Sequence, residues 1–396
     1  MLQIEALTVH GVAGIDELNL AFQPGINLIT GPNGSGKTTI LECIGHSFYA
    51  FAESSKVLHK NARQKRGAWS ITARVGTRQE RKELSVESFH PHEVMFLNEG
   101  FEDAAREALV FKSHRVLPYA EVLSIARDPL DDMNRFTHEA AAGAQVLDAK
   151  NWFVHRYLWS AHVGSLASAQ VRNLARAREC FGLLDPGLAF SRVMPETNDI
   201  LVATPSGEIY FEYLSAGYQS CVGLLLGLIK EIEYRFKSPP IEVGDFEGVV
   251  LVDDIDLHLH PALHVTIVGA LHEILPKAQI IATTHSPHLI QAAGPGEVIA
   301  LGFDRFGRVI QRDIPNGPFG FQGWTVDEVL REVLGLKTTR TPEVLDAVAQ
   351  FERAIQTSDK AAAFAAYKTL DLMLHPQSPS REDLKAALSR VGEKAS

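Results

Sequence analysis

Two short stretches of this 396-residue chain combine residue types and spacings that could do chemistry. The first, GPNGSGKT at Gly31–Thr38, places glycines ahead of a lysine and a hydroxyl residue. Such a loop turns backbone N–H groups inward around phosphates, and the positive end of the following helix adds to the attraction. Lys37 would bridge the β- and γ-phosphates, and Thr38 would bind Mg²⁺ through its hydroxyl. A nucleotide site is therefore predicted in preference to a glycine-rich turn with a chance lysine.

The second stretch, GVVLVDDIDLHLHP, runs from four apolar residues into adjacent acids. A buried strand ending in Asp253 is where a phosphate-loop enzyme places its second Mg²⁺ contact, and Asp254 would then polarise the attacking water. A different metal site is the rival interpretation, because the histidines show H-x-H and H-x-x-H spacing. In a short extended segment, side chains two residues apart point to the same side, so packing alone would also explain the H-x-H spacing. The four candidate ligands of this rival site are His258, His260, His285 and His288.

Two further segments extend the first interpretation. In TTHSP, His285 follows an apolar strand, where an imidazole can reach a γ-phosphate or the attacking water. In YLSAGYQS, Ser215 and Gly217 open an apolar helix and make a second anion-binding end. One chain rarely needs two such ends for one nucleotide, so we predict that this end caps the γ-phosphate held by a second protomer. A serine N-cap followed by a turn glycine is the simpler alternative.

Periodicity indicates the elements that must position these residues. Alternating apolar residues predict strands over residues 1–30 and again over 69–97. Residues 102–184 look mainly helical, without a sustained heptad repeat. LVATPSGEIYFEYL is typical of a hairpin, and GVVLVDD and QIIATTHS predict buried parallel strands joined by a helix. The last ~70 residues predict amphipathic helices.

Composition limits the class of protein. Hydrophobic content of 45% and charged content of 22% are ordinary for a globular chain. No apolar run approaches the ~18 residues that span a bilayer, and the first residues do not resemble a signal peptide. Cys43, Cys180 and Cys221 lie far apart, so we expect a cytoplasmic protein with no membrane partner. The net charge of −10 excludes a chain that is basic throughout.

One local stretch is nevertheless basic. Lys56–Lys82 contains many lysines and arginines and a single acid, Glu80, with Trp69 as a possible stacking neighbour. It could follow the backbone of double-stranded DNA, dock an acidic partner protein, or be a solvated surface. The candidate contacts are Lys56, Lys60, Arg63, Lys65, Arg66, Arg74, Arg78, Arg81 and Lys82.

The order GPNGSGKT, LSAGYQS, LVDDIDLHLHP, TTHSP resembles the ABC-type ATPase heads of the SMC, RecF and OLD-like group. Within that group the chain is most similar to stand-alone bacterial AAA-type ATPases, such as the ATPase subunits of the Septu and PARIS anti-phage systems. The resemblance implies an α/β fold: a two-lobe P-loop ATPase head with a short helical insertion, a helical C-terminal tail and no long coiled coil. The N-terminal β lobe would carry the phosphate loop. The implied domains are residues 1–99, 100–198, 199–320 and 321–396.

By the same resemblance, two protomers sandwich two ATP molecules head to tail. Asp254 and His285 would be the catalytic acid and the switch histidine, and Thr38 and Asp253 would bind Mg²⁺. The implied nucleotide contacts in one protomer are Gly31, Asn33, Gly34, Ser35, Gly36, Lys37, Thr38 and Thr39. Those supplied by the other protomer are Ser215, Gly217 and Gln219.

The chain departs from the family pattern in three places. Asp254 stands where the family usually has glutamate, and a carboxylate displaced by about 1 Å can cost ~10²-fold in rate. HGVAGI has no arginine where relatives often carry N-F-R. The glutamine that links the two lobes is not assigned, although Arg115 in FKSHRVLPY is a candidate phosphate or interface contact.

These observations lead to an expected function. We expect an ATP-hydrolysing switch subunit that controls a separate effector, a nuclease, in bacterial anti-phage defence. The acidic clusters of a fused TOPRIM nuclease are missing after His285, which favours an effector on another chain. A RecF-like DNA repair ATPase is the alternative, with ATP-dependent DNA binding as its output. A transporter ATPase fits less well, because LSAGYQS departs from LSGGQ.

Overall fold

The computed structural model describes residues 1–49, 51–52, 58–91, 95–96, 99–113, 121–122, 124, 127–315 and 317–393. Lys56 and Arg115 lie outside the described residues. The chain divides into two compact units, Met1–Gly335 and Leu336–Ser396. The finer domain boundaries expected within the first unit stay predictions.

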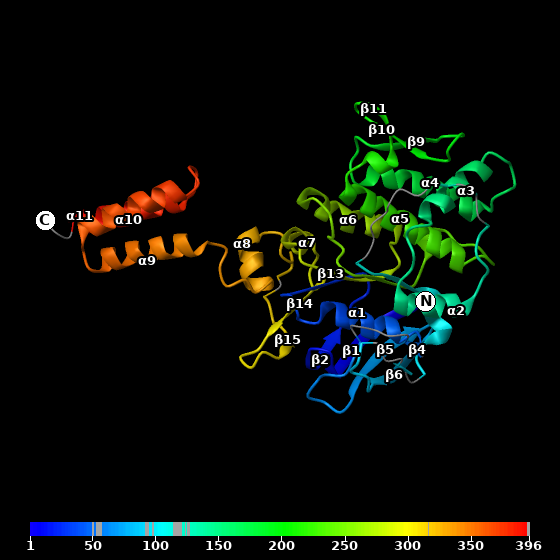
Figure 1. Ribbon diagram of the computed structural model, residues 1–396, viewed down its shortest axis with the longest axis horizontal. Coiled ribbons are helices and arrows are strands. Elements are labelled where there is room, and N and C mark those ends of the chain that lie inside the picture. The colour runs from blue at the N-terminus through cyan, green and yellow to red at the C-terminus, as the bar shows by residue number, and fades with distance from the viewer. Residues whose placement is uncertain are drawn as a thin grey trace. The chain divides into compact units, whose positions relative to one another are not determined.

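A six-stranded sheet forms the centre of the larger unit, in the order β15-β14-β3-β13-β12-β8 (Figure 1). All neighbours are parallel except β15, which is antiparallel to β14. Every residue of β3, β8, β12 and β13 is buried, as expected for parallel strands covered on both faces. The strands are β3 (Ile26–Thr30), β8 (Ala108–Phe111), β12 (Val249–Val252), β13 (Gln279–Thr284), β14 (Val298–Phe303) and β15 (Val309–Gln311).

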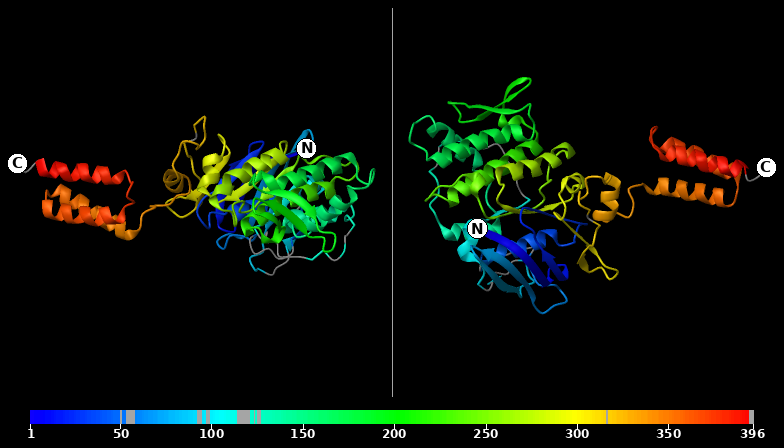
Figure 2. Two further views of the ribbon diagram at one scale, coloured as in Figure 1. Left: turned by 90° about the horizontal axis from the view of Figure 1, so that it is seen from above. Right: turned by 180° about the vertical axis from the view of Figure 1, so that it is seen from behind.

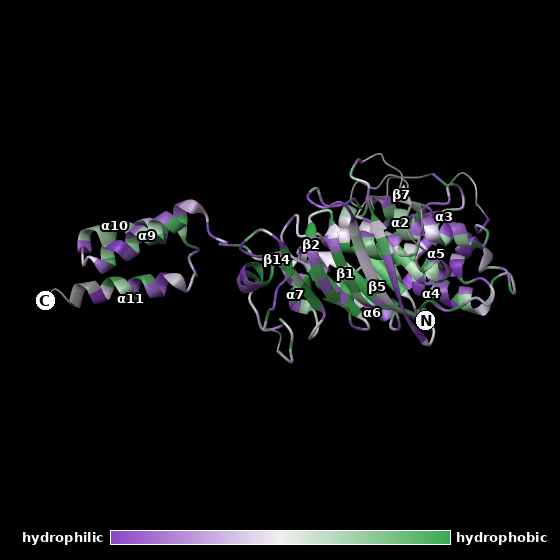
Figure 3. Cartoon of the chain, turned by 90° about the horizontal axis from the view of Figure 1, so that it is seen from below, coloured by the Kyte–Doolittle hydropathy of each residue, from purple (hydrophilic) through white to green (hydrophobic). Residues whose placement is uncertain are grey.

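One face of this sheet packs against α1 and an antiparallel sheet in the order β2-β1-β5-β6. Val249 and Leu251 of β12 point into this core, because successive side chains of a strand point to opposite faces. Figure 3 shows β1 and β5 side by side and largely hydrophobic. The elements are β1 (Leu2–Val12), β2 (Ile15–Ala21), α1 (Lys37–His46), β4 (Phe51–Ala52), β5 (Gly67–Val75), β6 (Arg78–Val86), β7 (Met95–Phe96), η1 (Glu102–Glu107) and α2 (Met133–Ala142).

The opposite face of the six-stranded sheet is covered by helices (Figure 2). Val250 and Val252 pack there against α5, which is buried from Gly217 to Arg235 except at Gln219. A small sheet, β11-β10-β9, adjoins these helices. The elements are α3 (Ala149–Trp159), α4 (Ser168–Leu183), β9 (Ala189–Val193), β10 (Ile200–Thr204), β11 (Gly207–Tyr210), η2 (Phe211–Tyr213), α5 (Ala216–Arg235), η3 (Val243–Asp245), α6 (Pro261–Ile274) and α7 (Pro287–Ala292).

The larger unit ends with short helical turns, and the smaller unit is helical. A separate core of Ala347, Phe351, Ala366 and Leu370 holds the smaller unit together. In the part of the chain that the structure describes, no helix is long and apolar enough to cross a membrane. These last elements are α8 (Val326–Glu328), the π-helical turn η4 (Val329–Val333), α9 (Pro342–Gln356), α10 (Lys360–Met373) and α11 (Ser380–Glu393).

The fold is the α/β P-loop architecture expected from the sequence. The hairpin β10–β11, the parallel unit β12-α6-β13 and the serine-capped apolar helix α5 are confirmed. Within the described ranges the longest helix, α5, has 20 residues, so no long coiled-coil arm is present there.

One expectation about the sheets is wrong. The strand before the phosphate loop, β3, lies between β13 and β14 in the same sheet as the acid pair, and not in a separate N-terminal β lobe. Residues 102–184 are mainly helical where the structure describes them, as predicted, and Ala108–Phe111 additionally forms β8 beside β12. A four-residue apolar run cannot be told from a buried turn of helix by periodicity, so β8 was not predicted.

The side chain of Gln279 joins the two large sheets. It is 3% exposed and lies at the start of β13, opposite a β-bulge in β1. Its Oε1 accepts from Ile4 N–H (2.7 Å), and its Nε2 donates to the carbonyls of Ile4 (2.8 Å) and Gln23 (2.9 Å). The pairing of β1 with β2 reaches only to Ala6 and Ala21, so Ile4 lies beyond it, and the Gln279 side chain supplies partners for the Ile4 backbone.

We predict that Gln279→Leu destabilises the larger unit. Two buried backbone groups of Ile4 would lose their partners, and each such loss costs roughly 1–3 kcal/mol, or roughly 2–6 kcal/mol in all. Urea unfolding followed by tryptophan fluorescence measures this, because Trp69, Trp152, Trp159 and Trp324 all lie in that unit. Gln311→Leu, at an exposed position in β15, is the matched control, and an equal loss there would contradict the prediction.

Candidate functional site

The phosphate loop (Gly31–Thr38) connects β3 to α1. Gly34 and Gly36 have φ values of +79° and +86°, a left-handed backbone that glycine adopts without strain. At Gly36 a Cβ would also lie 2.8 Å from Ile15 Cδ1. The helix begins at Lys37, so the positive end of α1 faces the loop.

Polar groups inside the loop suit an anion. Lys37 is buried, and its Nζ donates to the carbonyls of Gly31 (3.0 Å) and Pro32 (3.1 Å). Burial lowers the pKa of Lys37, and the nearby carboxylates of the acid loop oppose that shift. The hydroxyl of Ser35 is buried without a hydrogen-bond partner among the described residues. An orphaned donor beside a buried amine fits a phosphate, which accepts hydrogen bonds from both.

Asp253 brings four elements together at the carboxyl end of β12. Its N–H donates to Phe111 O on β8 (2.9 Å), and its Oδ1 accepts from the Thr283 hydroxyl on β13 (2.7 Å). The Thr38 hydroxyl on α1 lies 3.2 Å from both carboxylate oxygens. A carboxylate and a hydroxyl at this spacing are the oxygen ligands that Mg²⁺ prefers, so the donor set fits the predicted metal.

Asp254, the second residue of the acid loop (Asp253–His260), has an unusual backbone. Its φ is +48°, and its N–H donates to the Thr283 hydroxyl (2.7 Å). Aspartate adopts this left-handed region far more readily than longer side chains do. Burial and the neighbouring charge of Asp253 raise the pKa of Asp254, while His285 and Lys37 act in the opposite direction.

His285 is exposed just after β13, with its backbone held by Asp256. Its N–H donates to both carboxylate oxygens of Asp256, at 3.2 and 3.3 Å. Neither Asp256 nor Thr283 was among the site residues predicted from sequence. The D-x-D spacing of Asp254 and Asp256 was the available signal for the first, whereas nothing local distinguishes Thr283 from its neighbour Thr284.

The structure does not assemble the rival histidine site. His260 caps α6, with Nδ1 accepting from Ala262 N–H (3.3 Å), and Nδ1 of His288 lies 3.3 Å from Gln291 Oε1. His258 is exposed at φ +64°. Among the residues that the structure describes, no three His, Cys, Asp or Glu side chains are grouped to hold a metal ion.

The signature segment (Tyr213–Ser220) packs against the acid loop. Ser215 caps α5 by accepting from Tyr218 N–H (3.3 Å), and it is exposed. A Cβ at Gly217 would lie 2.2 Å from the His258 carbonyl oxygen, so only glycine permits this contact. Gln219 turns back on its own chain, donating to the carbonyls of Glu212 (2.9 Å) and Leu214 (2.7 Å).

The basic stretch forms a mixed surface. Trp69 is 1% exposed and donates to the Ser47 hydroxyl (3.0 Å), so the expectation that it stacks on a base is wrong. Arg74 pairs with Glu5 (2.6 Å). The other described cations make local contacts or lie in solvent: Lys60 donates to Gln64 O, Arg81 donates to the Ser70 hydroxyl, Lys82 lies over the Phe101 ring, and Arg63, Lys65, Arg66 and Arg78 are exposed.

Comparison with known proteins identifies matching family models and similar proteins. A family model described as "AAA domain" matches residues 6–107, and one described as "AAA domain, putative AbiEii toxin, Type IV TA system" matches residues 91–291. The chain is 43% identical over 394 residues to the Septu protein PtuA of Bacillus thuringiensis, covering 99% of each. It is 26% identical over 278 residues to a Septu protein PtuA of Bacillus mycoides, covering 69% of this chain and 36% of that protein. An SMC head domain from Thermotoga maritima, covering 79% of this chain and 100% of that one, superposes with a TM-score of 0.44 at 14% identity.

We predict that Gly217→Ala lowers stability by separating α5 from the acid loop. Overpacking at a site without room costs about 1–3 kcal/mol. Gly269→Ala in α6 is the matched control, because a Cβ there meets nothing within 4 Å and alanine favours a helix by roughly 0.5–1 kcal/mol. Urea unfolding should show opposite shifts for the two variants, and equal shifts would contradict the close packing at Gly217.

A second prediction concerns Asp254 and pH. Its raised pKa means that the folded chain holds a proton that the unfolded chain has already lost, so this residue costs stability as pH rises through that window. Asp254→Asn should therefore raise the unfolding midpoint of the nucleotide-free chain at neutral pH. The gain should disappear below the ordinary aspartate pKa of 3.8. Asp313→Asn, at an exposed position, is the control, and a gain that grows with acidity would contradict the assignment.

Proposed function

From the premise that this chain belongs to the PtuA family of AAA-type ATPases, we propose that it binds ATP with Mg²⁺ between two copies of itself and hydrolyses it as a switch. One observation carries the proposal. The Thr38 hydroxyl and the Asp253 carboxylate, 215 residues apart in sequence, meet at 3.2 Å beside the buried amine of Lys37. This is the arrangement that a Mg²⁺-nucleotide requires of a phosphate-loop protein.

The residues divide the work of hydrolysis. The phosphate loop and Lys37 bind and orient the phosphates, and Thr38 and Asp253 hold the metal. Mg²⁺, when bound, offsets charge on the phosphate oxygens. Asp254 accepts a hydrogen bond from the attacking water and draws its proton. His285, whose charge lowers the pKa of Asp254, favours the ionised acid that this step needs.

Hydrolysis is proposed to be slow. Asp254 is one methylene shorter than glutamate, and its burial favours the protonated form. A water held about 1 Å from its best position reacts ~10²-fold more slowly. A chain with these properties stays in its ATP-bound state for long periods, which suits a switch better than a motor.

The second anion-binding end supports a composite dimer. Ser215 is exposed at the first turn of α5, where free N–H groups and the helix dipole attract an anion. In a two-fold dimer this end of one protomer would complete the nucleotide site of its partner. Gln219 contributes by shaping the loop before Ser215.

We propose that the switch controls a separately encoded effector, a nuclease, in bacterial anti-phage defence, and the similarity to Septu proteins supports the defence role. Two features support a partner. The described residues hold no second metal cluster, and the small helical unit Leu336–Ser396 exposes Phe364, Leu372 and Met373. A RecF-like output, ATP-dependent binding of double-stranded DNA, is the second candidate, and the exposed Arg63, Lys65 and Arg66 favour it. Salt-sensitive DNA binding that needs ATP and no other protein would support that second candidate.

ATP turnover per protomer, measured over a wide range of protein concentration, tests the proposal. We expect specific activity to rise with concentration, since the site is completed only in the dimer. Asp254→Asn should keep ATP binding and lose about 10²-fold or more in turnover. Asp313→Asn, which loses one exposed charge, should behave as the parent protein. Turnover independent of concentration would overturn the composite site, and failure to bind ATP would overturn the proposal as a whole.

A further inference from the structure

Lys150 lies on α3, one of the helices that cover the six-stranded sheet on the face opposite α1, and it links this helix to the signature segment. Its Nζ lies 2.6 Å from Asp199 Oδ1 and 2.5 Å from Glu212 Oε1. The lysine side chain is 12% exposed. Glu212 lies in η2, three residues before Ser215. Burial opposes the charge on Lys150, but its hydrogen bonds to Asp199 and Glu212 outweigh burial and raise its pKa.

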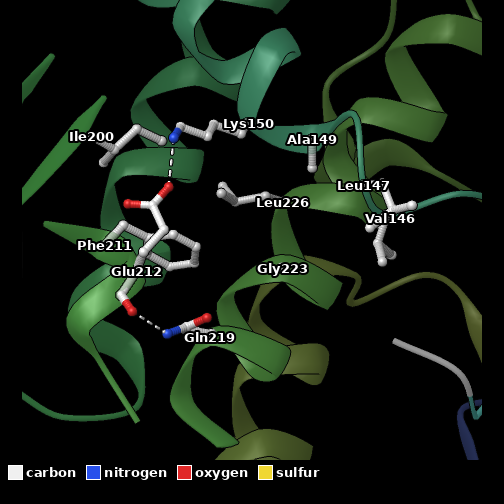
Figure 4. A pocket seen from close by; sticks show the side chains of 10 residues that line it. All are labelled: Val146, Leu147, Ala149, Lys150, Ile200, Phe211, Glu212, Gln219, Gly223 and Leu226. Atoms are coloured by element: carbon white, nitrogen blue, oxygen red, sulfur yellow. Dashed lines mark hydrogen bonds and ion pairs between the residues drawn. The ribbon is translucent and has the colours of Figure 1, made fainter. Parts of the chain in front are cut away.

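This ion pair lies in the wall of a small pocket (Figure 4). The pocket has a volume of about 30 Å³, which is room for roughly two water molecules. Figure 4 shows Lys150 and the Glu212 carboxylate meeting on one side, with Gln219 reaching the main chain of Glu212 on the other. A space of this size excludes a nucleotide or a metabolite. Its lining residues Lys150, Glu212 and Gln219 come from α3, η2 and α5, so the pocket marks the place where these three elements meet.

Contacts from Gln219 and from Lys150 fix the loop before α5. Gln219 donates to the carbonyls of Glu212 and Leu214, which fixes the main chain. Lys150 holds the Glu212 side chain, which fixes the loop against α3. Ser215 follows at once, so these contacts set the direction in which the first turn of α5 points.

The far end of α5 is tied to the same helical region by buried charges. Arg156 of α3 lies 2.6 Å from Glu233, and Arg235 lies 2.7 Å from Glu139 of α2. Lys230 contacts Asp148, the residue before α3. Charges this deeply buried depend on their partners, because an uncompensated one is strongly destabilising. The region around α2 and α3 therefore positions α5 at both of its ends.

We propose that Lys150 is a positioning residue for the signature segment, acting through Glu212 to aim the N-terminus of α5 at the nucleotide held by the partner protomer. This inference rests on the composite site proposed above. It predicts that Lys150 affects hydrolysis in the partner's site and leaves the phosphate loop of its own chain intact. A protein that moved α3 would then change hydrolysis in the neighbouring copy.

Lys150→Met removes the charge and keeps the length of the side chain. We expect kcat for ATP to fall about tenfold or more, with KM within about threefold, since the chain's own phosphate loop is unchanged. Lys150→Arg keeps both ion pairs and should retain turnover within about threefold. A merely structural role would lower stability without this separation of kcat from KM.

Mixing two impaired variants provides the decisive measurement. A Lys37→Ala protomer has an impaired phosphate loop and an intact signature segment. A Lys150→Met protomer has an intact phosphate loop and a misdirected signature segment. In a mixed dimer one of the two composite sites is built from intact halves. Equal amounts give mixed dimers in half of the population, so turnover should recover to about a quarter of the parent value. Ser215→Ala mixed with Lys37→Ala is the reference pair, because Ser215 lies in the signature segment itself.

Each outcome is decisive. Recovery in both pairs supports the inference. Recovery in the Ser215 pair alone would show that Lys150 acts within its own chain and would overturn it, as would parental turnover in Lys150→Met by itself. Failure of both pairs would overturn the composite site, and this inference with it. If tryptophan fluorescence shows that Lys150→Met does not fold, Glu212→Gln replaces it in the same mixture, because it loosens the loop and leaves the contact of Lys150 with Asp199.

Discussion

The hydroxyl of Thr283 is the contact on which the rest of the site depends. It donates to Asp253 and accepts from the N–H of Asp254, both at 2.7 Å, and its side chain is completely buried at the end of β13. A valine would fill the same volume, but it would leave a carboxylate oxygen and a backbone N–H without this partner. Because β13 lies between β3 and β12, this one hydroxyl fixes the acids relative to the phosphate loop.

The same constraint gives a physical reason for aspartate at position 254. The Thr283 contact holds the backbone of Asp254 at φ +48°, where aspartate is several-fold enriched over most other residues. A glutamate would reach further toward a water but would be more strained there. The chain therefore combines a readily formed backbone turn with a short, partly buried acid of raised pKa. This combination supports the slow hydrolysis proposed above.

The sequence was most informative where the chemistry is contiguous. The phosphate loop, the acid pair and the serine cap each occupy a few neighbouring residues, so type and spacing predict them. Pairings across the chain were not accessible in this way. Gln279 reaches Ile4 over 275 residues, and Lys150 reaches Glu212 over 62, and no periodicity records either contact. Trp69 was misassigned for the same reason, because its partner Ser47 lies on a different element.

The buried charges of α5 are better explained by their effect on where the helix lies than by their contribution to the stability of the fold. The helix buries the run Gly223–Ile229, and its charged residues Glu233 and Arg235 are buried as well. Buried ion pairs add little net stability, since desolvation offsets their attraction, but they permit few alternative arrangements. Glu233 and Arg235 therefore fix where α5 lies, and the Lys150–Glu212 pair fixes where it begins. In the dimer proposed above, this would make the helical region of one copy a determinant of the nucleotide chemistry in the other.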